Sequence, residues 1–407
     1  MIGKVLKAAG VLATLLVVGV VGFLGYCSWN VSSRKFAAPL PDIKADSSPE
    51  ALARGAQVFT MMCGDCHINR TTGKATGRWM DDVPAPLGHF ETANLTHDEE
   101  FGIGKLSDGM IARVIRTGIH HDGTVNIFPM PHFTDLSDAD IAAVLGYLRS
   151  DAPVLAADKA HLARPKLSVV PGLIIQTFVV PPNPEAASKH IEAPKKAATV
   201  EYGHYAANAV YQCWDCHTEG FSPSKRDGLD VYGGGFELAD PAGAQIFASN
   251  ITFSKEGVDG WTLEQFARAV REGIRPDGYL VRSPMPKWRA IDDTEMAAIY
   301  AYLLTVPPSH KATKPGKAVK VKAPPPDMHP DAQFVALGCS TCHAKGAAYH
   351  EKIKACAGKP VDEVAAWIRN PEKTKPNTQM PTFADLITEE QAKALAAWVQ
   401  ENPARAD

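Results

Sequence analysis

The chain has 407 residues, of which 45% are hydrophobic and 21% charged, and its formal net charge is −3 at pH 7. At about 150 residues per domain, this length suggests two or three domains. The composition excludes collagen repeats, extended low complexity and a coiled-coil array. The chain also lacks the large basic excess that neutralises phosphates, so we expect no nucleic-acid partner.

An uncharged apolar run from Ala8 to Tyr26 follows Lys4 and Lys7 near the N-terminus. At about 1.5 Å per residue, such a helix nearly crosses a hydrocarbon core of about 30 Å. We therefore expect residues 1–45 to form a transmembrane anchor and a short tether. The alternative is a cleaved signal peptide, but the run is longer than the usual apolar region and no good small-x-small site follows it. Lipidation at Cys27 also stays open, although a bulky tyrosine precedes this cysteine.

Six of the eight cysteines occur in three copies of a Cys-x-x-Cys-His pattern. The copies are Cys63-x-x-Cys66-His67, Cys213-x-x-Cys216-His217 and Cys339-x-x-Cys342-His343. At this spacing the two thiols bond to the vinyl groups of one haem, and the histidine becomes an iron ligand. A zinc site would need a second ligand pair close by, and a thioredoxin-like pair would need a βαβ context. The sequence has neither, so we expect three covalently attached c-type haems.

The cysteines outside these motifs are Cys27 and Cys356, and we expect Cys356 to be a buried free thiol. The motifs also predict the location of the chain. Flanking charges do not set the orientation across a membrane, because Arg34 and Lys35 balance the two lysines before the apolar run. Since a cytochrome c body lies outside the cytoplasm, we expect a single-pass protein of the bacterial inner (cytoplasmic) membrane, with its haem domains on the periplasmic side.

An internal repeat relates the first two motif-bearing segments. Asn94-Leu95-Thr96 recurs as Asn250-Ile251-Thr252, and Pro129-Met130-Pro131 recurs as Pro284-Met285-Pro286. Met130 and Met285 are 155 residues apart, so two domains share one plan. The third segment has Met380-Pro381 but lacks the Asn-x-Thr element, and Met380 follows His343 by 37 residues, whereas Met130 follows His67 by 63.

The repeated methionine is a candidate axial ligand to haem iron. A methionine beside prolines is a poor core filler, because the prolines hold the backbone rigid. A thioether ligand to iron favours the reduced state and raises the potential. The expected axial pairs are His67–Met130, His217–Met285 and His343–Met380. Bis-histidine ligation is the alternative, and the competing histidines are His120, His121 and His132 for Met130, and His350 for Met380; no histidine occurs between His217 and His310.

Amphipathic helices flank each candidate methionine, because apolar residues recur at i, i+3 and i+4 on both sides of it. The helices after the methionines have start signals at Ser137-x-x-Asp140, Asp292-x-x-Glu295 and Thr388-x-x-Gln391. We therefore expect a mainly α fold, with three class I cytochrome c-like domains in tandem after the transmembrane helix. The expected domains are residues 46–151, 200–305 and 327–407, with linkers at 152–199 and 306–326.

Together these motifs resemble the triple-haem cytochrome c subunit of membrane-bound bacterial alcohol and gluconate dehydrogenases. The resemblance holds over residues 55–153 and is best over Tyr205–Leu304, at Cys213–His217, Gly233-Gly234-Gly235, Asn250-Ile251-Thr252, Gly260-Trp261 and Pro284-Met285-Pro286. It implies a subunit that takes electrons from a periplasmic catalytic partner and passes them to quinone or a later carrier. The short third segment departs from this pattern.

Two functions follow from the predicted haems. Three six-coordinate haems leave no open iron for a substrate, which favours an electron-transfer subunit of an oxidoreductase complex with no catalytic residue of its own. Its expected partners are redox proteins, namely dehydrogenase or respiratory-complex subunits or another cytochrome. The alternative is a peroxidase-like multihaem enzyme with one open-coordination haem, for which His120 and His121 are the candidate acid–base residues.

Overall fold

The computed structural model describes residues 2–33, 35–69, 71–80, 88–126, 130–163, 166–168, 183–220, 226, 228–239, 245–282, 284–313, 321–344, 347, 349–375, 378 and 380–402. Arg34, Pro129 and residues 169–182 and 314–320 of the two predicted linkers lie outside them. The described chain is mainly helical, as predicted. It divides into two compact units, one formed by residues up to 56 with 66–193, the other by residues 57–65, 194–220 and those from 225 on.

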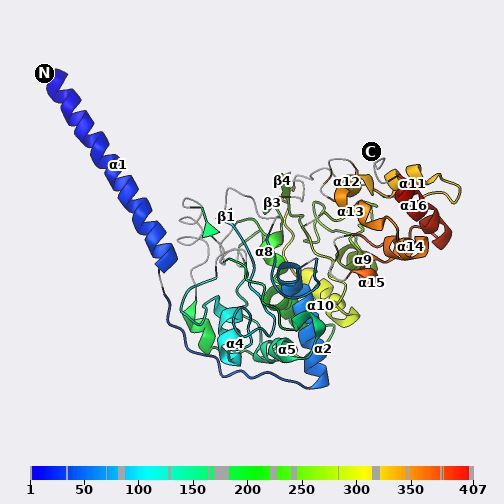
Figure 1. The fold of residues 1–407 in the computed structure, drawn as a ribbon, viewed down its shortest axis with the longest axis horizontal. Coiled ribbons are helices and arrows are strands. Elements are labelled where there is room, and N and C mark those ends of the chain that lie inside the picture. Colours follow the sequence, from blue (N-terminus) through cyan, green and yellow to red (C-terminus); the bar gives the residue numbers. More distant parts are fainter. Residues whose placement is uncertain are drawn as a thin grey trace. The chain divides into compact units, whose positions relative to one another are not determined.

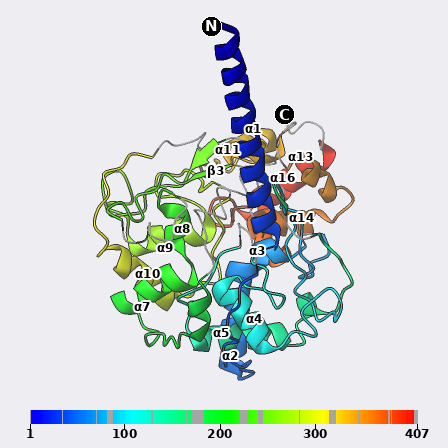
Figure 2. The same cartoon turned by 90° about the vertical axis from the view of Figure 1, so that its left-hand side faces the viewer.

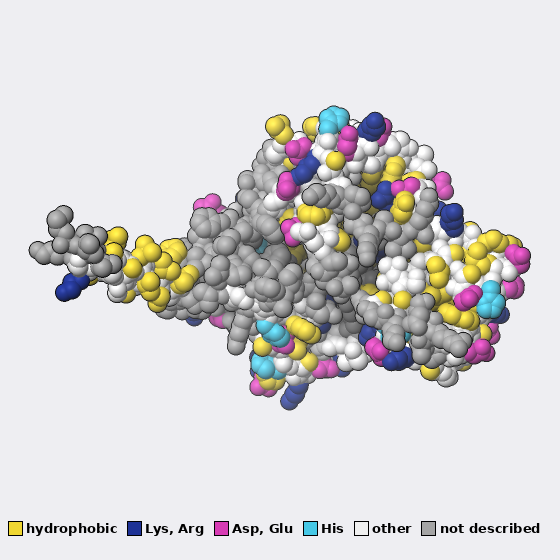
Figure 3. All heavy atoms as spheres, turned by 90° about the horizontal axis from the view of Figure 1, so that it is seen from above, with side chains coloured by type: hydrophobic (Ala, Val, Ile, Leu, Met, Phe, Trp, Pro, Cys, Tyr) yellow, Lys and Arg dark blue, Asp and Glu magenta, His cyan; other side chains and the backbone are white. Residues whose placement is uncertain are grey.

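Helix α1 (Ile2–Ser33) is the first element of the first unit, and Figure 3 shows hydrophobic side chains along it. Its segment Ala9–Tyr26 has a mean hydropathy of 2.2 and is not buried. The helix is long and apolar enough to cross a membrane, and a signal sequence near an N-terminus has the same properties. The predicted apolar helix is therefore present.

The rest of the first unit contains helices joined by long loops (Figure 2). Its elements are α2 (Pro49–Val58, of which residues up to 56 belong to this unit), α3 (Gly64–His67, of which residues from 66 on belong to it), β1 (Gly88–His89), α4 (Asp108–Thr117), α5 (Asp138–Arg149), the 3₁₀ turn η3 (Pro153–Leu155), β2 (Lys166–Leu167) and the 3₁₀ turn η5 (Pro184–Ser188). β1 pairs with β2 in antiparallel register. The Ser137 side chain accepts a hydrogen bond from Asp140 N, which confirms the predicted start of α5. Ile111, Ile119, Leu136, Ile141 and Leu145 are buried in its core.

The second unit contains the second and third motifs (Figure 1). Its elements are the π-helical turns η1 (Phe59–Cys63) and η6 (Ala206–Val210), helices α7 (Val200–Tyr205), α8 (Cys213–His217), α9 (Leu263–Glu272), α10 (Asp293–Leu303), α11 (Pro330–Ala336), α12 (Ser340–His343), α13 (His350–Ile353), α14 (Val361–Arg369), α15 (Pro371–Thr374) and α16 (Glu389–Glu401), the 3₁₀ turn η8 (Lys354–Cys356), and the antiparallel strands β3 (Glu237–Ala239) and β4 (Gln245–Phe247). Asp292 and Thr388 cap α10 and α16, as predicted. Because α4, α9 and α14 also form, the helices expected before each methionine are confirmed.

A hydrophobic cluster lies in the last part of the second unit, and we call it the third hydrophobic cluster because it adjoins the third motif. It contains Phe334, Leu337, Ile353, Val364, Ala365, Ile368, Phe383, Ile387, Ala392, Leu395, Ala396 and Val399. These side chains come from α11, α13, α14 and α16 and the loops between them. The division into three domains stays a prediction, although this cluster gives the third segment a separate core.

Two helix crossings depend on glycine. A Cβ atom on Gly55 of α2 would lie 2.0 Å from Ala143 O of α5, and one on Gly203 of α7 would lie 1.9 Å from Ala298 O of α10. Only a residue without a side chain lets the two backbones approach so closely. Since Ala143 and Ala298 are also 155 residues apart, the internal repeat extends to the helix packing.

Candidate functional site

Each Cys-x-x-Cys-His motif lies on a short helix. In the first copy the helical backbone runs from η1 into α3, the second copy is α8, and the third begins with Cys339 as the N-cap of α12. In a helix, residues three and four positions apart lie on the same face. The spacing therefore directs both thiols and the imidazole of each motif to one side of its helix, as attachment to a single flat cofactor requires.

The histidine of each motif makes the same kind of hydrogen bond. His67 Nδ1 lies 2.8 Å from Ala93 O, His217 Nδ1 lies 2.7 Å from Ser249 O, and His343 Nδ1 lies 3.0 Å from Tyr349 O. Because a carbonyl oxygen only accepts, Nδ1 carries the proton and Nε2 keeps its lone pair. Burial also lowers the pKa of all three imidazoles, which keeps them neutral. Neutral imidazoles oriented in this way fit an iron ligand.

The first cysteines of the second and third motifs are half-buried. Burial, reinforced by the second thiol of the same motif, raises the pKa of Cys213 and Cys339 to about 12. Among the described residues, no group of three or more His, Cys, Asp or Glu side chains could hold a metal ion. Cys356, expected to be buried, is a half-buried free thiol beside the third hydrophobic cluster.

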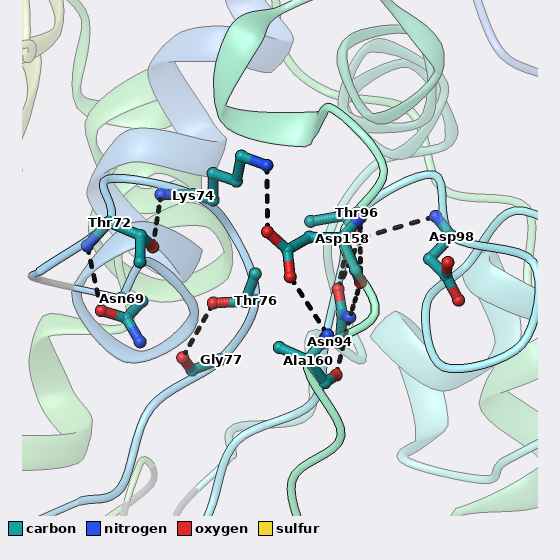
Figure 4. Close-up of polar contacts among 10 residues, drawn as sticks. All are labelled: Asn69, Thr72, Lys74, Thr76, Gly77, Asn94, Thr96, Asp98, Asp158 and Ala160. Carbon is teal, nitrogen blue, oxygen red and sulfur yellow. Dashed lines mark hydrogen bonds and ion pairs between the residues drawn. The ribbon is translucent and has the colours of Figure 1, made fainter.

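The carbonyls that orient the first two histidines immediately precede the repeated Asn-x-Thr elements. Asn94 Oδ1 accepts hydrogen bonds from the backbone N and Oγ1 of Thr96 at 2.9 and 2.7 Å. Its Nδ2 donates to Asp158 O at 2.8 Å and Ala160 O at 3.0 Å (Figure 4). We call this set of contacts the first Asn-x-Thr clasp. It fastens the turn that follows Ala93 to the chain that leaves α5.

The second Asn-x-Thr clasp repeats this arrangement. Asn250 Oδ1 accepts from the backbone N and Oγ1 of Thr252 at 2.9 and 2.7 Å. Its Nδ2 donates to Ser309 O at 2.8 Å and Lys311 O at 3.3 Å. The repeat thus has a physical role that sequence reasoning did not assign, because the contacts join the asparagine to backbone oxygens about 60 residues along the chain.

The three candidate axial methionines are half-buried, and each has a described neighbour. Met130 Sδ accepts a hydrogen bond from Asn126 Nδ2 at 2.9 Å. Met285 N donates to Arg282 O at 3.1 Å. Met380 packs against the third hydrophobic cluster, as does Cys339 of the third motif. The axial roles of all three methionines stay predictions.

The competing histidines have contacts of their own. His120 lies in a turn, where its backbone N donates to Thr124 O at 2.8 Å. The His132 ring lies against Gly118, and burial lowers its pKa to about 4. His350 Nδ1 lies 3.0 Å from His343 O, so that ring is held beside the backbone of the third motif. These contacts leave the choice between methionine and histidine to experiment.

Two segments of the chain match known protein families. Residues 52–151 match the family model described as cytochrome c, and residues 327–399 match the model described as cytochrome C oxidase, cbb3-type, subunit III. The first and third motifs lie inside these segments. The two models differ, which agrees with the departure of the third segment from the repeat.

Relatives of the chain include subunits of several dehydrogenases. The fructose dehydrogenase cytochrome subunit of Gluconobacter japonicus is 38% identical over 31% of this chain and 24% of its own length. A nicotinate dehydrogenase subunit of Pseudomonas putida is 27% identical over 74% of this chain and 25% of its own length. The cytochrome c subunit of alcohol dehydrogenase (quinone) from Komagataeibacter europaeus is 24% identical over 78% and 70%.

The chain therefore spans about a quarter of the length of the first two of these relatives. The predicted resemblance to cytochrome c subunits of dehydrogenases is confirmed by these matches. Relatives of this kind are electron-transfer subunits rather than catalytic ones. The substrates in the names of these relatives are stated for those proteins.

Proposed function

We propose that the chain is a membrane-anchored triheme cytochrome c. It carries electrons between a periplasmic dehydrogenase or respiratory complex and a quinone or downstream cytochrome. The observation that carries the proposal is the common environment of His67, His217 and His343, each with Nδ1 bound to a backbone carbonyl and each beside two cysteines. The matches to cytochrome c models and to dehydrogenase cytochrome subunits support it.

In this proposal the protein holds and tunes its cofactors. A bound haem supplies one-electron chemistry. Cys63, Cys66, Cys213, Cys216, Cys339 and Cys342 would attach the haems, and His67, His217, His343, Met130, Met285 and Met380 would supply the nitrogen and sulfur ligands to iron. Each backbone carbonyl fixes the tautomer and the ring orientation of its histidine, which strengthens nitrogen donation to iron. Residues 46–151, 200–305 and 327–407 are the proposed haem domains.

Haem stoichiometry and spin state test this proposal. The purified full-length chain should contain three haems by pyridine haemochrome absorbance and mass spectrometry, all low-spin, with the weak near-infrared band of sulfur ligation. Met285→Ala should convert one haem to high spin, and an unchanged spectrum would refute that ligand. A peroxidase-like enzyme would instead show a substantial high-spin fraction that binds carbon monoxide or peroxide in the unmodified protein.

The proposed location is the bacterial inner membrane, with α1 as a single-pass anchor and the haem domains in the periplasm. The exposed apolar surface of α1 supports this location. Membrane fractionation together with mass spectrometry of the mature N-terminus tests it. An anchored protein should retain residues 8–26 and resist carbonate extraction, whereas a cleaved signal peptide would leave a shorter chain in the soluble fraction.

A further inference from the structure

Arg289 joins the segment that carries Met285 to the segment that carries Met380. Its side chain is only 14% exposed. Nη1 donates to Glu372 Oε2 at 2.7 Å, while Nη2 donates to Met380 O at 3.3 Å and to Thr382 Oγ1 at 3.0 Å. Three donor contacts from one planar guanidinium fix the distance and angle between the two segments far better than a single ion pair would.

The same guanidinium faces helix α9. Its Nε atom lies 3.8 Å from Glu272 Oε2, so Arg289 sits between Glu272 of α9 and Glu372 of α15. These two short helices lie side by side in Figure 1, although they are 100 residues apart in the chain. A buried cation flanked by two carboxylates is a fixed part of this interface, because removing one member would leave an uncompensated charge.

This contact is not a product of the internal repeat. The residue 155 positions before Arg289 is Thr134, whose hydroxyl donates to Asp135 Oδ2 at 3.2 Å. An arginine at this position is thus specific to the second segment. Its side chain reaches the part of the third segment that carries the candidate axial ligand, which a structural role shared by both repeats would not explain.

We propose that Arg289 is the bridge through which the haems of the second and third motifs exchange electrons, so that these two haems are direct neighbours in the transfer sequence. The inference rests on the proposed function. One electron leaves one iron, which is oxidised, and reaches the other iron, which is reduced, in either direction. No proton moves with it, because the guanidinium stays protonated throughout.

Two physical effects follow from the bridge. The path from Met285 to Met380 O passes along the four residues after Met285 and across one hydrogen bond, which Arg289 Nη2 donates. The positive charge of Arg289, held in a poorly solvated interface, also stabilises the less positive, reduced state of both irons. Removing the side chain should therefore slow the exchange and lower both potentials together.

The test compares Arg289→Met with Arg275→Met in the full-length, haem-loaded chain. Both changes replace a guanidinium by an aliphatic side chain, but Arg275 pairs with Asp277 where the side chains are 38% and 43% exposed. Transient absorption after photoreduction measures electron redistribution between the second and third haems, whose signals are assigned with Met285→Ala and Met380→Ala. We expect Arg289→Met to slow this step about tenfold and to lower both midpoint potentials, and Arg275→Met to change neither.

An unchanged rate in Arg289→Met with three haems bound would overturn the bridge, as would a potential shift confined to the first haem. If Arg289→Met does not load haem, Glu372→Gln decides, because it loosens one end of the guanidinium. We expect that variant to slow the step about twofold, and an unchanged rate would overturn the bridge. Fewer than three haems in the unmodified chain would refute the proposed function instead, so the two failures are distinguishable.

Discussion

His67 and His343 are each oriented by a backbone carbonyl, but the two carbonyls lie at different distances along the chain from their histidines. The carbonyl that orients His67 belongs to Ala93, 26 residues later, whereas the one that orients His343 belongs to Tyr349, only six residues later. The distant acceptor needs the Asn-x-Thr clasp to hold its turn in place. The near one needs only a short turn, which is why the third segment manages with fewer residues between its histidine and its methionine.

The difference shows which parts of the molecule each site depends on. In the first two segments, ligand orientation is linked to the chain that leaves the last helix, through contacts about 60 residues apart in the sequence. In the third segment, it depends on local backbone and on a compact hydrophobic cluster. Changes far from the motif should therefore affect the first two haems and spare the third.

The largest expected effect is at the helix crossings. Gly203→Ala places a Cβ atom 1.9 Å from Ala298 O, so α7 and α10 must separate. We expect the free energy of unfolding to fall by about 3 kcal/mol or more, measured by urea denaturation. Glu201→Ala on the exposed side of α7 is the matched control and should have little effect. Tolerance of Gly203→Ala would contradict the close crossing.

A smaller loss is expected at the Asn-x-Thr clasp. Asn94→Ala removes the two donor and two acceptor contacts of a side chain that is 6% exposed. We expect it to lower the free energy of unfolding by about 1–3 kcal/mol and to shift the potential of the first haem but not of the third. Asn69→Ala, which removes only two exposed turn contacts, is the control. Equal shifts in the potentials of the first and third haems would contradict the dependence of the first site on the clasp.

The first two segments also differ at the methionine sulfur. Asn126 Nδ2 donates to Met130 Sδ, and the residue 155 positions later is Val281. A donor on the sulfur weakens its donation to oxidised iron, so Asn126→Val should lower the first potential by about 1 kcal/mol in redox free energy. The reverse change, Val281→Asn, should raise the second potential. Potentiometric titration checks both, and shifts of the opposite sign would contradict the role of Asn126.

The smallest effect is a pH dependence in the first unit. The Asp138 hydrogen bond raises the pKa of His190 above its ordinary value of 6.5. Burial raises the pKa of Asp138, but hydrogen bonds from Arg116 and His190 outweigh it, so that pKa is lowered below 3.8. The His190 contribution is full below pH 6.5 and is lost as the pH rises through the raised pKa, and the Asp138 contribution is lost as the pH falls through the lowered one.

The pair should therefore stabilise the first unit most between these limits. His190→Asn should flatten the rise in unfolding free energy seen from pH 8 to pH 6. An unchanged slope in His190→Asn would contradict the stabilising role of this pair.

Sequence reasoning predicted the elements with local signals. The caps at Ser137, Asp292 and Thr388 involve residues three apart, so the sequence contains all that forms them. The acceptors at Ala93 and Ser249 could not be predicted, because a backbone carbonyl has no side-chain signature. Arg289 could not be predicted from the repeat, because the repeat marks only positions that the two segments share.

The close helix crossings could be predicted from the sequence only in part. Gly55 and Gly203 each fall in an apolar helical segment shortly before a motif, and a glycine in a helix costs stability unless packing requires it. That signal is visible in the sequence and could have indicated the close approach. The clasp was likewise visible as a repeated Asn-x-Thr, but its role depends on contacts with the chain beyond the last helix.

The π-helical turn η1 sets the phase of the first motif. From α2 through η1 to α3 the backbone is helical without a break, and η1 takes one residue more per turn than an α-helix would. The wider turn holds this extra residue inside a stretch that is otherwise α-helical. A single deletion within η1 would remove the residue that makes the turn wide, so this stretch should then become α-helical from Gly55 to His67.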